Sequence, residues 1–138
     1  MYYEVSLSKI EIQARLAKEL GIELFVLDDG WFRKGNDSRS SMGNWECNVS
    51  KLPGGIEAVA DLVHGMGLQF GLWFEPEAIS RDSQLFRTHP DWILQLPQVS
   101  PREGRHEYLL DLGRDEVCDY LLQVLHRYLG TGKIDYIK

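Results

Sequence analysis

Two adjacent carboxylates, Asp28 and Asp29, follow a short apolar run and precede Gly30. An ionised carboxylate accepts two or more hydroxyl protons at once, and such hydrogen bonds are about twice as strong as neutral ones. Side chains alternate along a strand, but a turn at Gly30 allows both carboxylates to face one ligand. The pair therefore suits a ligand that carries several hydroxyl groups. A turn with an N-capping aspartate is the alternative explanation.

A second group of candidate residues lies around the end of another apolar run, at Trp73, Glu75 and Glu77. A tryptophan ring stacks on apolar C–H groups of a ligand, although the hydrophobic core is the alternative location for a lone tryptophan. Two carboxylates about 5–5.5 Å apart form the catalytic pair of a retaining glycosidase. By residue type alone, Glu75 and Glu77 are candidate catalytic acids.

The elements that must position these residues alternate between helical and strand patterns. Ser8 and Glu11 fit a capping box, in which each side chain satisfies a backbone N–H of the first turn. Ile12, Leu16 and Leu20 then recur at four-residue spacing. This periodicity, with Ala17 beside these residues, predicts an amphipathic helix that has them on its apolar face.

Later segments repeat the alternation of helix and strand. A second helix is predicted around 56–63, where Ile56, Val59, Ala60 and Val63 share a face. Further helices are predicted at 81–88 and from Asp115 onwards, the latter with Val117, Leu121, Val124, Leu125 and Tyr128 facing inward. Strand patterns cover 23–27, 68–74, 107–112 and 134–138, with a stub at 2–5.

This alternation is typical of an α/β fold with a parallel sheet, and polar residues follow several of its strands, including Glu75, Asp111 and Lys138. Both a (β/α)8 barrel and an open doubly wound sheet bind ligands at the carboxyl ends of their strands. A nucleotide site is not expected, because no Gly-x-Gly-x-x-Gly turn follows a strand. A complete barrel needs about 250 residues, so the 138 residues predict a partial one of about four β/α units.

Composition excludes several classes of protein. The net charge of -6 argues against a nucleic-acid surface. No apolar run has the length of a membrane span, and no signal peptide is recognisable, so no membrane partner and a cytoplasmic location are expected. Cys47 and Cys118 lack metal-ligand spacing and predict two reduced thiols. His64, His89, His106 and His126 form no metal-binding motif.

Six strings in order resemble family 36 of the glycoside hydrolases, the α-galactosidases. They are GIELFVLDDGWF at 21–32, GNW at 43–45 with KLPGG at 51–55, FGLWFEPE at 70–77, HPDW at 89–92, EGR at 103–105 and IDYIK at 134–138. The resemblance implies that residues 1–138 are the N-terminal half of a catalytic (β/α)8 barrel, with flanking β domains outside them. It also implies retaining hydrolysis of terminal α-galactosides of the melibiose and raffinose type, with no cofactor and no metal.

The resemblance assigns roles to individual residues. It implies that Asp28 and Asp29 bind the 4- and 6-hydroxyls of galactose and that Trp73 stacks on the sugar. Arg105 and Lys138 match positions that donate to substrate hydroxyls. Trp31 and Trp45 either line a subsite or pack in loops.

The resemblance argues against Glu75 and Glu77 as the catalytic pair. The family nucleophile is the aspartate of Lys-Trp-Asp, expected just after Lys138, and its acid/base lies much further along, so no catalytic residue is expected within the chain. The residues 1–138 are then expected to be inactive alone.

Three alternatives remain open at this stage. The chain is a fragment of a hydrolase whose parent is an oligomer, or a natural half-barrel that binds or assembles through its exposed sheet edges. A third possibility keeps the family and changes the reaction, to galactosyl transfer as in raffinose synthases or to hydrolysis of N-acetylgalactosaminides. Asn44, where aspartate is commoner in the family, and Cys47 are departures in a loop near the expected site.

Overall fold

The computed structural model describes residues 3–138 and contains two small sheets. The central sheet is parallel, in the order β1-β2-β5, and consists of β1 (Leu24–Leu27), β2 (Gln69–Leu72) and β5 (Tyr136–Ile137). A separate antiparallel pair consists of β3 (Ala78–Ile79) and β4 (Tyr108–Leu109). The predicted α/β fold with a parallel sheet is therefore confirmed.

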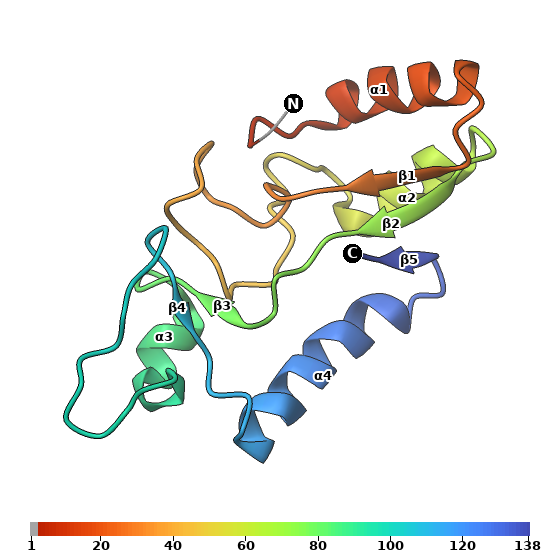
Figure 1. Cartoon of the computed structure of the whole chain (residues 1–138). Helices are drawn as coiled ribbons and strands as arrows, with labels where there is room; N and C mark the ends of the chain where they lie inside the picture. Colours follow the sequence, from red (N-terminus) through yellow and green to blue (C-terminus); the bar gives the residue numbers. More distant parts are fainter. Residues whose placement is uncertain (1–2) are drawn as a thin grey trace.

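Four α-helices and one short 3-10 helix surround the sheets over the described residues. They are α1 (Leu7–Glu19), α2 (Gly55–His64), α3 (Gln84–Thr88), η1 (Pro90–Trp92) and α4 (Asp115–Leu129). In the view of Figure 1, α1 lies above the central sheet, α2 behind it and α4 below it. The loops that leave the carboxyl ends of β1 and β2 gather on the opposite side from the α1–β1 connection.

The predicted capping box of α1 is wrong. Ser6 is the N-cap, and its Oγ accepts a hydrogen bond from the backbone N–H of Lys9 at 3.4 Å. Glu11 instead accepts a hydrogen bond from Arg15 at 2.7 Å. The helix thus begins one residue before Ser8, since Ser6 already satisfies an exposed N–H of the first turn.

The predicted apolar face of α1 is also wrong except at Ala17, although the helix itself is present. Ile12, Leu16 and Leu20 remain 60%, 53% and 79% exposed. The buried residues are Ile10, Ala14 and Ala17. Small alanine side chains allow the helix to approach α2 and the sheet closely, and this choice of face depends on the neighbours and not on periodicity alone.

The apolar faces of α2 and α4 agree with the prediction. In α2 the four predicted residues are all buried. In α4 the buried residues are Val117, Leu121, Val124 and Tyr128, while Leu125 is only partly buried. Acidic residues begin α4 and basic residues end it, which favours the helix through its dipole.

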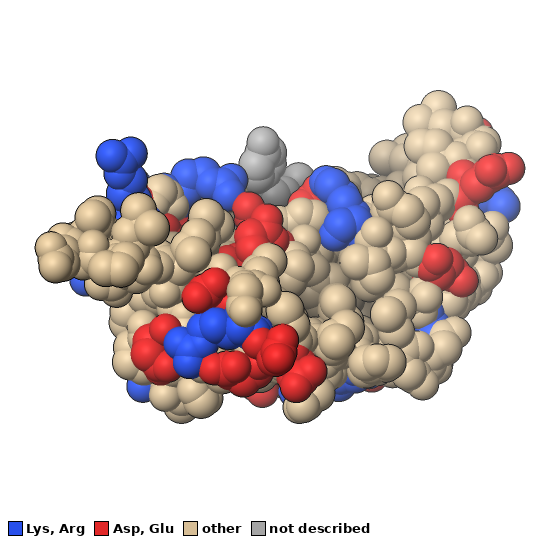
Figure 2. Space-filling view, turned by 60° about the horizontal axis from the view of Figure 1, so that its bottom comes forward, with Lys and Arg blue, Asp and Glu red and all other residues tan. Residues whose placement is uncertain are grey.

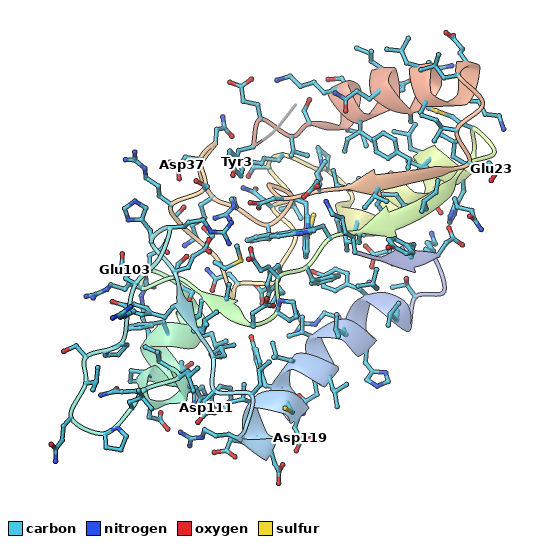
Figure 3. All side chains as sticks on the ribbon, viewed as in Figure 1. Tyr3, Glu23, Asp37, Glu103, Asp111 and Asp119 are labelled. Atoms are coloured by element: carbon cyan, nitrogen blue, oxygen red, sulfur yellow. The ribbon has the colours of Figure 1, made fainter. Side chains whose placement is uncertain are left out.

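The 107–112 segment was predicted as a further strand of the parallel sheet, and this prediction is wrong. β4 pairs antiparallel with β3, through Ala78 with Leu109 and Ile79 with Tyr108. Asp111 therefore lies away from the carboxyl edge of the parallel sheet, near the start of α4 (Figure 3), where its Oδ1 accepts a hydrogen bond from Gly113 N–H. Tyr2 of the predicted stub lies outside the described residues, and residues 3–5 form no strand.

An aromatic cluster connects the site loops to the sheet. Trp31 contacts Phe74 and Tyr128 edge-to-face, with ring centroids 5.4 and 5.3 Å apart. Its Nε1 donates to the backbone oxygen of Trp73 at 3.0 Å, and the hydroxyl of Tyr128 donates to the backbone oxygen of Trp45 at 2.8 Å. These bonds attach the loop after β1 to β2 and to α4, and so hold the loop residues in place.

Candidate functional site

A cavity of about 760 Å³ lies at the carboxyl ends of β1 and β2. Four of the five predicted substrate-binding residues line it, namely Asp28, Asp29, Trp73 and Arg105. Lys138 does not line the cavity, but its side chain contacts Asp28, which does. In Figure 3, Tyr3 and Glu103 mark the end of the molecule that holds these loops, and Glu23 marks the opposite end of β1.

Asp28 joins the end of β1 to the end of β5. Its Oδ2 accepts a hydrogen bond from Lys138 Nζ at 2.6 Å, and its Oδ1 accepts one from the N–H of Asp29 at 2.8 Å. Partial desolvation acts to raise the pKa of Asp28, but these two hydrogen bonds and the charge of Lys138 outweigh it, so the pKa is lowered. Asp28 is therefore an ionised acceptor at neutral pH.

Asp29 is held by an arginine that the sequence analysis did not single out. Arg33 donates from Nε to Oδ1 at 2.6 Å and from Nη2 to Oδ2 at 2.8 Å. Its side chain is 1% exposed, and its Nη1 also donates to the backbone oxygen of Ser40. A bidentate pair of this kind fixes the plane of the carboxylate.

Arg105 approaches the same cavity from the loop before β4. It donates to Glu75 at 2.7 Å and lies 3.5 Å from Glu107, while its side chain stays 75% exposed. The hydrogen bond to Glu75 and the negative charges of Glu75 and Glu107 raise the pKa of Arg105. The guanidinium therefore stays charged and has donors left for a ligand.

Glu107 was also missed, and it lies between the two arginines. It is 8% exposed, with 3.7 Å to Arg33 and 3.5 Å to Arg105. Burial, and then the charge of Glu75, raise its pKa, against the opposing effect of Arg105 and Arg33. Arg33 stands four residues after Asp29, a spacing that signals ion pairing in helices, but no helix is present here and the sequence offered no further signal.

The three tryptophans named as site candidates fall into two groups. Trp73 is partly exposed and lines the cavity, so its ring is accessible to a ligand. Trp31 and Trp45 are 0% and 2% exposed and do not line it. Of the two alternatives for Trp31 and Trp45, the structure favours packing over contact with a ligand in this cavity.

The glutamates after β2 do not form a paired acid site. Glu75 lines the cavity and accepts the hydrogen bond from Arg105, whereas Glu77 does not line it. The backbone oxygen of Glu77 accepts a hydrogen bond from Leu110 N–H at 2.8 Å, next to the β3–β4 pair. This geometry agrees with a supporting role for Glu75.

A second cavity, of about 840 Å³, lies between the 43–50 loop, α3 and α4. Asn44 lines it, and its Oδ1 accepts a hydrogen bond from Gln84 N–H at 2.7 Å. Burial, and then the charge of Glu57, raise the pKa of the Cys47 thiol to about 11. Both departures from the family strings therefore lie outside the first cavity.

Histidine, cysteine and carboxylate side chains are spread over residues 3–138. No group of three or more His, Cys, Asp or Glu side chains in this range could hold a metal ion. None of the helices in this range could cross a bilayer. On the face shown in Figure 2, basic side chains lie beside acidic ones in a mixed cluster.

Parallel strands, a cavity at their carboxyl ends and converging charged groups define an α/β protein with a candidate site for a polar ligand. A family model described as Melibiase matches residues 1–138. The chain therefore belongs to the melibiase family.

Individual relatives agree with this assignment. The chain is 47% identical over 137 residues to the α-galactosidase AgaA of Geobacillus stearothermophilus, which covers 99% of this chain and 19% of that protein. It is 41% identical over 138 residues to an α-galactosidase of Escherichia coli, covering 100% of this chain and 20% of the relative. The chain thus spans about a fifth of the length of these relatives.

Solved structures show the same arrangement of the backbone. An α-galactosidase from Lactobacillus brevis matches with a TM-score of 0.92 at 44% identity, over 99% of this chain and 18% of that one. A family 36 AgaA variant from Geobacillus stearothermophilus, in complex with raffinose, also matches with a TM-score of 0.92, at 46% identity over 99% of this chain and 19% of that one.

Proposed function

We propose that this chain is part of an α-galactosidase and supplies much of the surface that recognises a terminal α-galactose. The observation that carries the proposal is the cavity in which Asp28, Asp29, Trp73 and Arg105 meet. Its volume of about 760 Å³ falls in the range of about 300–1,000 Å³ found for ligand sites. Relatives named α-galactosidase, one of them solved with raffinose, support the choice of sugar.

The chemistry of the cavity suits galactose. Galactose differs from glucose by an axial 4-hydroxyl, and a site selects it by hydrogen bonds that the wrong epimer leaves unpaired. Asp28 and Asp29 supply charged acceptors for the 4- and 6-hydroxyls, and Trp73 supplies an apolar face. Arg105 and Lys138 supply donors, with Lys138 also holding Asp28.

We propose the same residues as the first part of a (β/α)8 barrel. The three parallel strands, with helices between them in sequence, follow the order of such a barrel. Two features of the structure support this placement. The candidate site lies at the carboxyl ends of the strands, and the sheet has two open edges, at β1 and β5. We also propose that the isolated chain associates with itself through these edges, because an unpaired strand invites a partner.

The chain is proposed to bind the sugar without cleaving it. Asp29, Glu75 and Glu107 are each engaged by an arginine, and no pair of carboxylates in the cavity is free to act as acid and nucleophile. Hydrolysis then requires residues supplied by the remaining four fifths of a protein of the relatives' length.

Saturation-transfer NMR with methyl α-galactoside tests the proposal directly. We expect binding of the galactoside, no comparable binding of methyl α-glucoside, and loss of binding in Asp28→Asn. The same sample is expected to release no p-nitrophenol from p-nitrophenyl α-galactoside. Equal binding of both epimers would contradict the assignment of the sugar.

A chimera provides a second measurement with a catalytic readout. The matching segment of Geobacillus AgaA is replaced by residues 1–138 of this chain, at 47% identity. We expect α-galactosidase activity on raffinose, and a large loss of kcat/KM when Asp28→Asn is introduced into the chimera. A folded chimera whose activity is unaffected by Asp28→Asn would refute the role given to this carboxylate.

A further inference from the structure

The loops that carry the proposed sugar-binding residues are connected at the wall of the cavity by two buried charged residues, Arg33 and Glu107, which line it. Asp29 comes from the turn after β1, and Arg105 comes from the loop before β4. Arg33 is 1% exposed and Glu107 is 8% exposed, and their charged atoms lie 3.7 Å apart. Buried charges of this kind persist only where each is paired.

We propose that Arg33 and Glu107 are positioning residues that hold Asp29 and Arg105 in register across the sugar site. The inference rests on the proposed galactoside-binding function and adds two residues that act through others. The ion pairs run in series from Asp29 to Arg33, from Arg33 to Glu107 and from Glu107 to Arg105. The Nη2 atom of Arg105 that faces Glu107 also donates to Glu75, at 2.7 Å.

The geometry at Asp29 shows what Arg33 does. A carboxylate has about four lone-pair positions. Arg33 occupies one on each oxygen, at 2.6 and 2.8 Å, and leaves one on each for hydroxyl donors. The side chain of Asp29 is 18% exposed and lines the cavity, so the remaining positions are accessible to a ligand. Arg33 thereby selects which rotamer of Asp29 the ligand meets.

Arg33 is itself fixed by its surroundings. Besides Asp29 and Glu107, it donates to the backbone oxygen of Ser40 and lies over the ring of Phe32 at 5.2 Å from its centroid. A lysine has no planar fork and cannot make the bidentate pair while also reaching Ser40. Arg33→Lys therefore keeps the charge and removes the orientation.

Glu107 connects the two sides because it is near both arginines. Its carboxylate lies near the buried guanidinium of Arg33 and the largely exposed one of Arg105, and without this negative charge the two cations would repel each other. Arg105 is 75% exposed, and its side chain is otherwise held by Glu75 at 2.7 Å. Glu107 thus restricts the side-chain conformations of Arg105 in the unliganded protein.

The first test is the affinity of the chain for methyl α-galactoside, measured by NMR titration in wild type, Arg33→Lys and the control Arg114→Lys. Arg114 also makes close carboxylate bonds, to Glu116 at 2.6 Å, but lies outside the cavity. We expect affinity to fall roughly tenfold or more in Arg33→Lys, because one charged hydrogen bond to the ligand is misplaced. In Arg114→Lys we expect it to fall less than about twofold. Equal affinity of wild type and Arg33→Lys would overturn the inference.

The second test is the pH profile of galactoside binding, which a purely structural role would not change. The charged or titratable groups around Glu107 are Arg33 and Asp29 from the turn after β1, Glu75 after β2, and Arg105 beside it, with Tyr3 and His106 also lining the cavity. As pH falls through the raised pKa of Glu107, wild-type affinity is expected to decrease. Glu107→Gln should bind weakly and lack this step, while His106 and Tyr3 are the same in both proteins.

A third measurement does not need a ligand. In Arg33→Gln, loss of the neighbouring cation should raise the pKa of Glu107 further, as followed by carbon-13 NMR of its carboxylate. No change would mean that the Arg33–Glu107 pair does not form, and the inference would fail even if galactoside binding were confirmed. A raised pKa in a chain that binds no galactoside would instead place the failure in the proposed function.

Discussion

The two cavities of this protein have similar volumes and different linings. The cavity at the strand ends, of about 760 Å³, receives three carboxylate–cation pairs, Asp28–Lys138, Asp29–Arg33 and Glu75–Arg105, each within 2.8 Å. The second cavity, of about 840 Å³, is lined by aromatic and aliphatic side chains together with amides, hydroxyls and a thiol, and the ion pair among its described lining residues, Arg127–Glu46, is long, at 3.9 Å. Volume alone therefore does not identify a site, and converging charged groups with spare acceptors do.

The difference has a physical origin in the fold. Parallel strands end at the same edge, so the loops after β1 and β2 and the residue after β5, Lys138, bring side chains together. The second cavity lies between a loop and two helices, where no strand ends converge. Matched substitutions in the two cavities test this contrast, because each is expected to have a larger effect in the first cavity than in the second.

The largest expected effect is on stability, from Arg33→Leu. It leaves Asp29 without its bidentate partner and Glu107 with only the exposed Arg105, and removal of one member of a buried pair costs about 3–5 kcal/mol. The matched change in the second cavity, Arg127→Leu, breaks a long and exposed pair and should cost below about 1 kcal/mol. Urea unfolding followed by circular dichroism measures both, and equal losses would remove the contrast.

The next effect is on binding. Asp29→Asn replaces a charged acceptor in the first cavity, and galactoside affinity is expected to fall about tenfold or more. Asn44→Ala in the second cavity loses a bond to Gln84 N–H, so it should lower stability by about 1 kcal/mol and leave affinity unchanged. Isothermal titration and thermal melts separate these outcomes. A loss of galactoside affinity in Asn44→Ala would show that the second cavity also contributes to binding and would contradict the contrast.

A smaller effect on stability is expected when the pH is lowered. The pKa of Asp28 is lowered in the folded protein, so its ion pair with Lys138 stabilises the fold above the unfolded pKa of about 3.9. That stability is lost as pH falls through the lower, folded pKa. Asp28→Asn should therefore show a shallower fall of Tm below about pH 4 than wild type. Parallel Tm curves would show that the exposed pair contributes nothing measurable.

The smallest effect is expected at the thiol of the second cavity. With a pKa of about 11, Cys47 is a thiolate in only about one molecule in a thousand at pH 8. In a Cys118→Ser background, iodoacetamide should label it far more slowly than a free cysteine, and labelled protein should keep its galactoside affinity. Fast labelling, followed by mass spectrometry, would contradict the buried environment of Cys47.

Sequence patterns predicted the buried face of a helix best where the helix has only one apolar face. The faces of α2 and α4 were predicted correctly because bulky apolar residues there have one place to go. α1 carries apolar residues on two faces, and the sheet selected the one with Ala14 and Ala17. The 107–112 segment has a strand pattern, but periodicity does not reveal which strand it pairs with or in which direction.

By itself, the sequence determined the α/β class, the family and the carboxylates, tryptophan and cations that a sugar site needs. Four of the five predicted residues line one cavity, and Lys138 reaches it through Asp28. Only the tertiary structure decided that Arg33 and Glu107 belong with them and that Trp31 and Trp45 do not line that cavity. The reason is that ion pairing and burial depend on distances between segments far apart in the chain, and local residue spacing contains no measure of those distances.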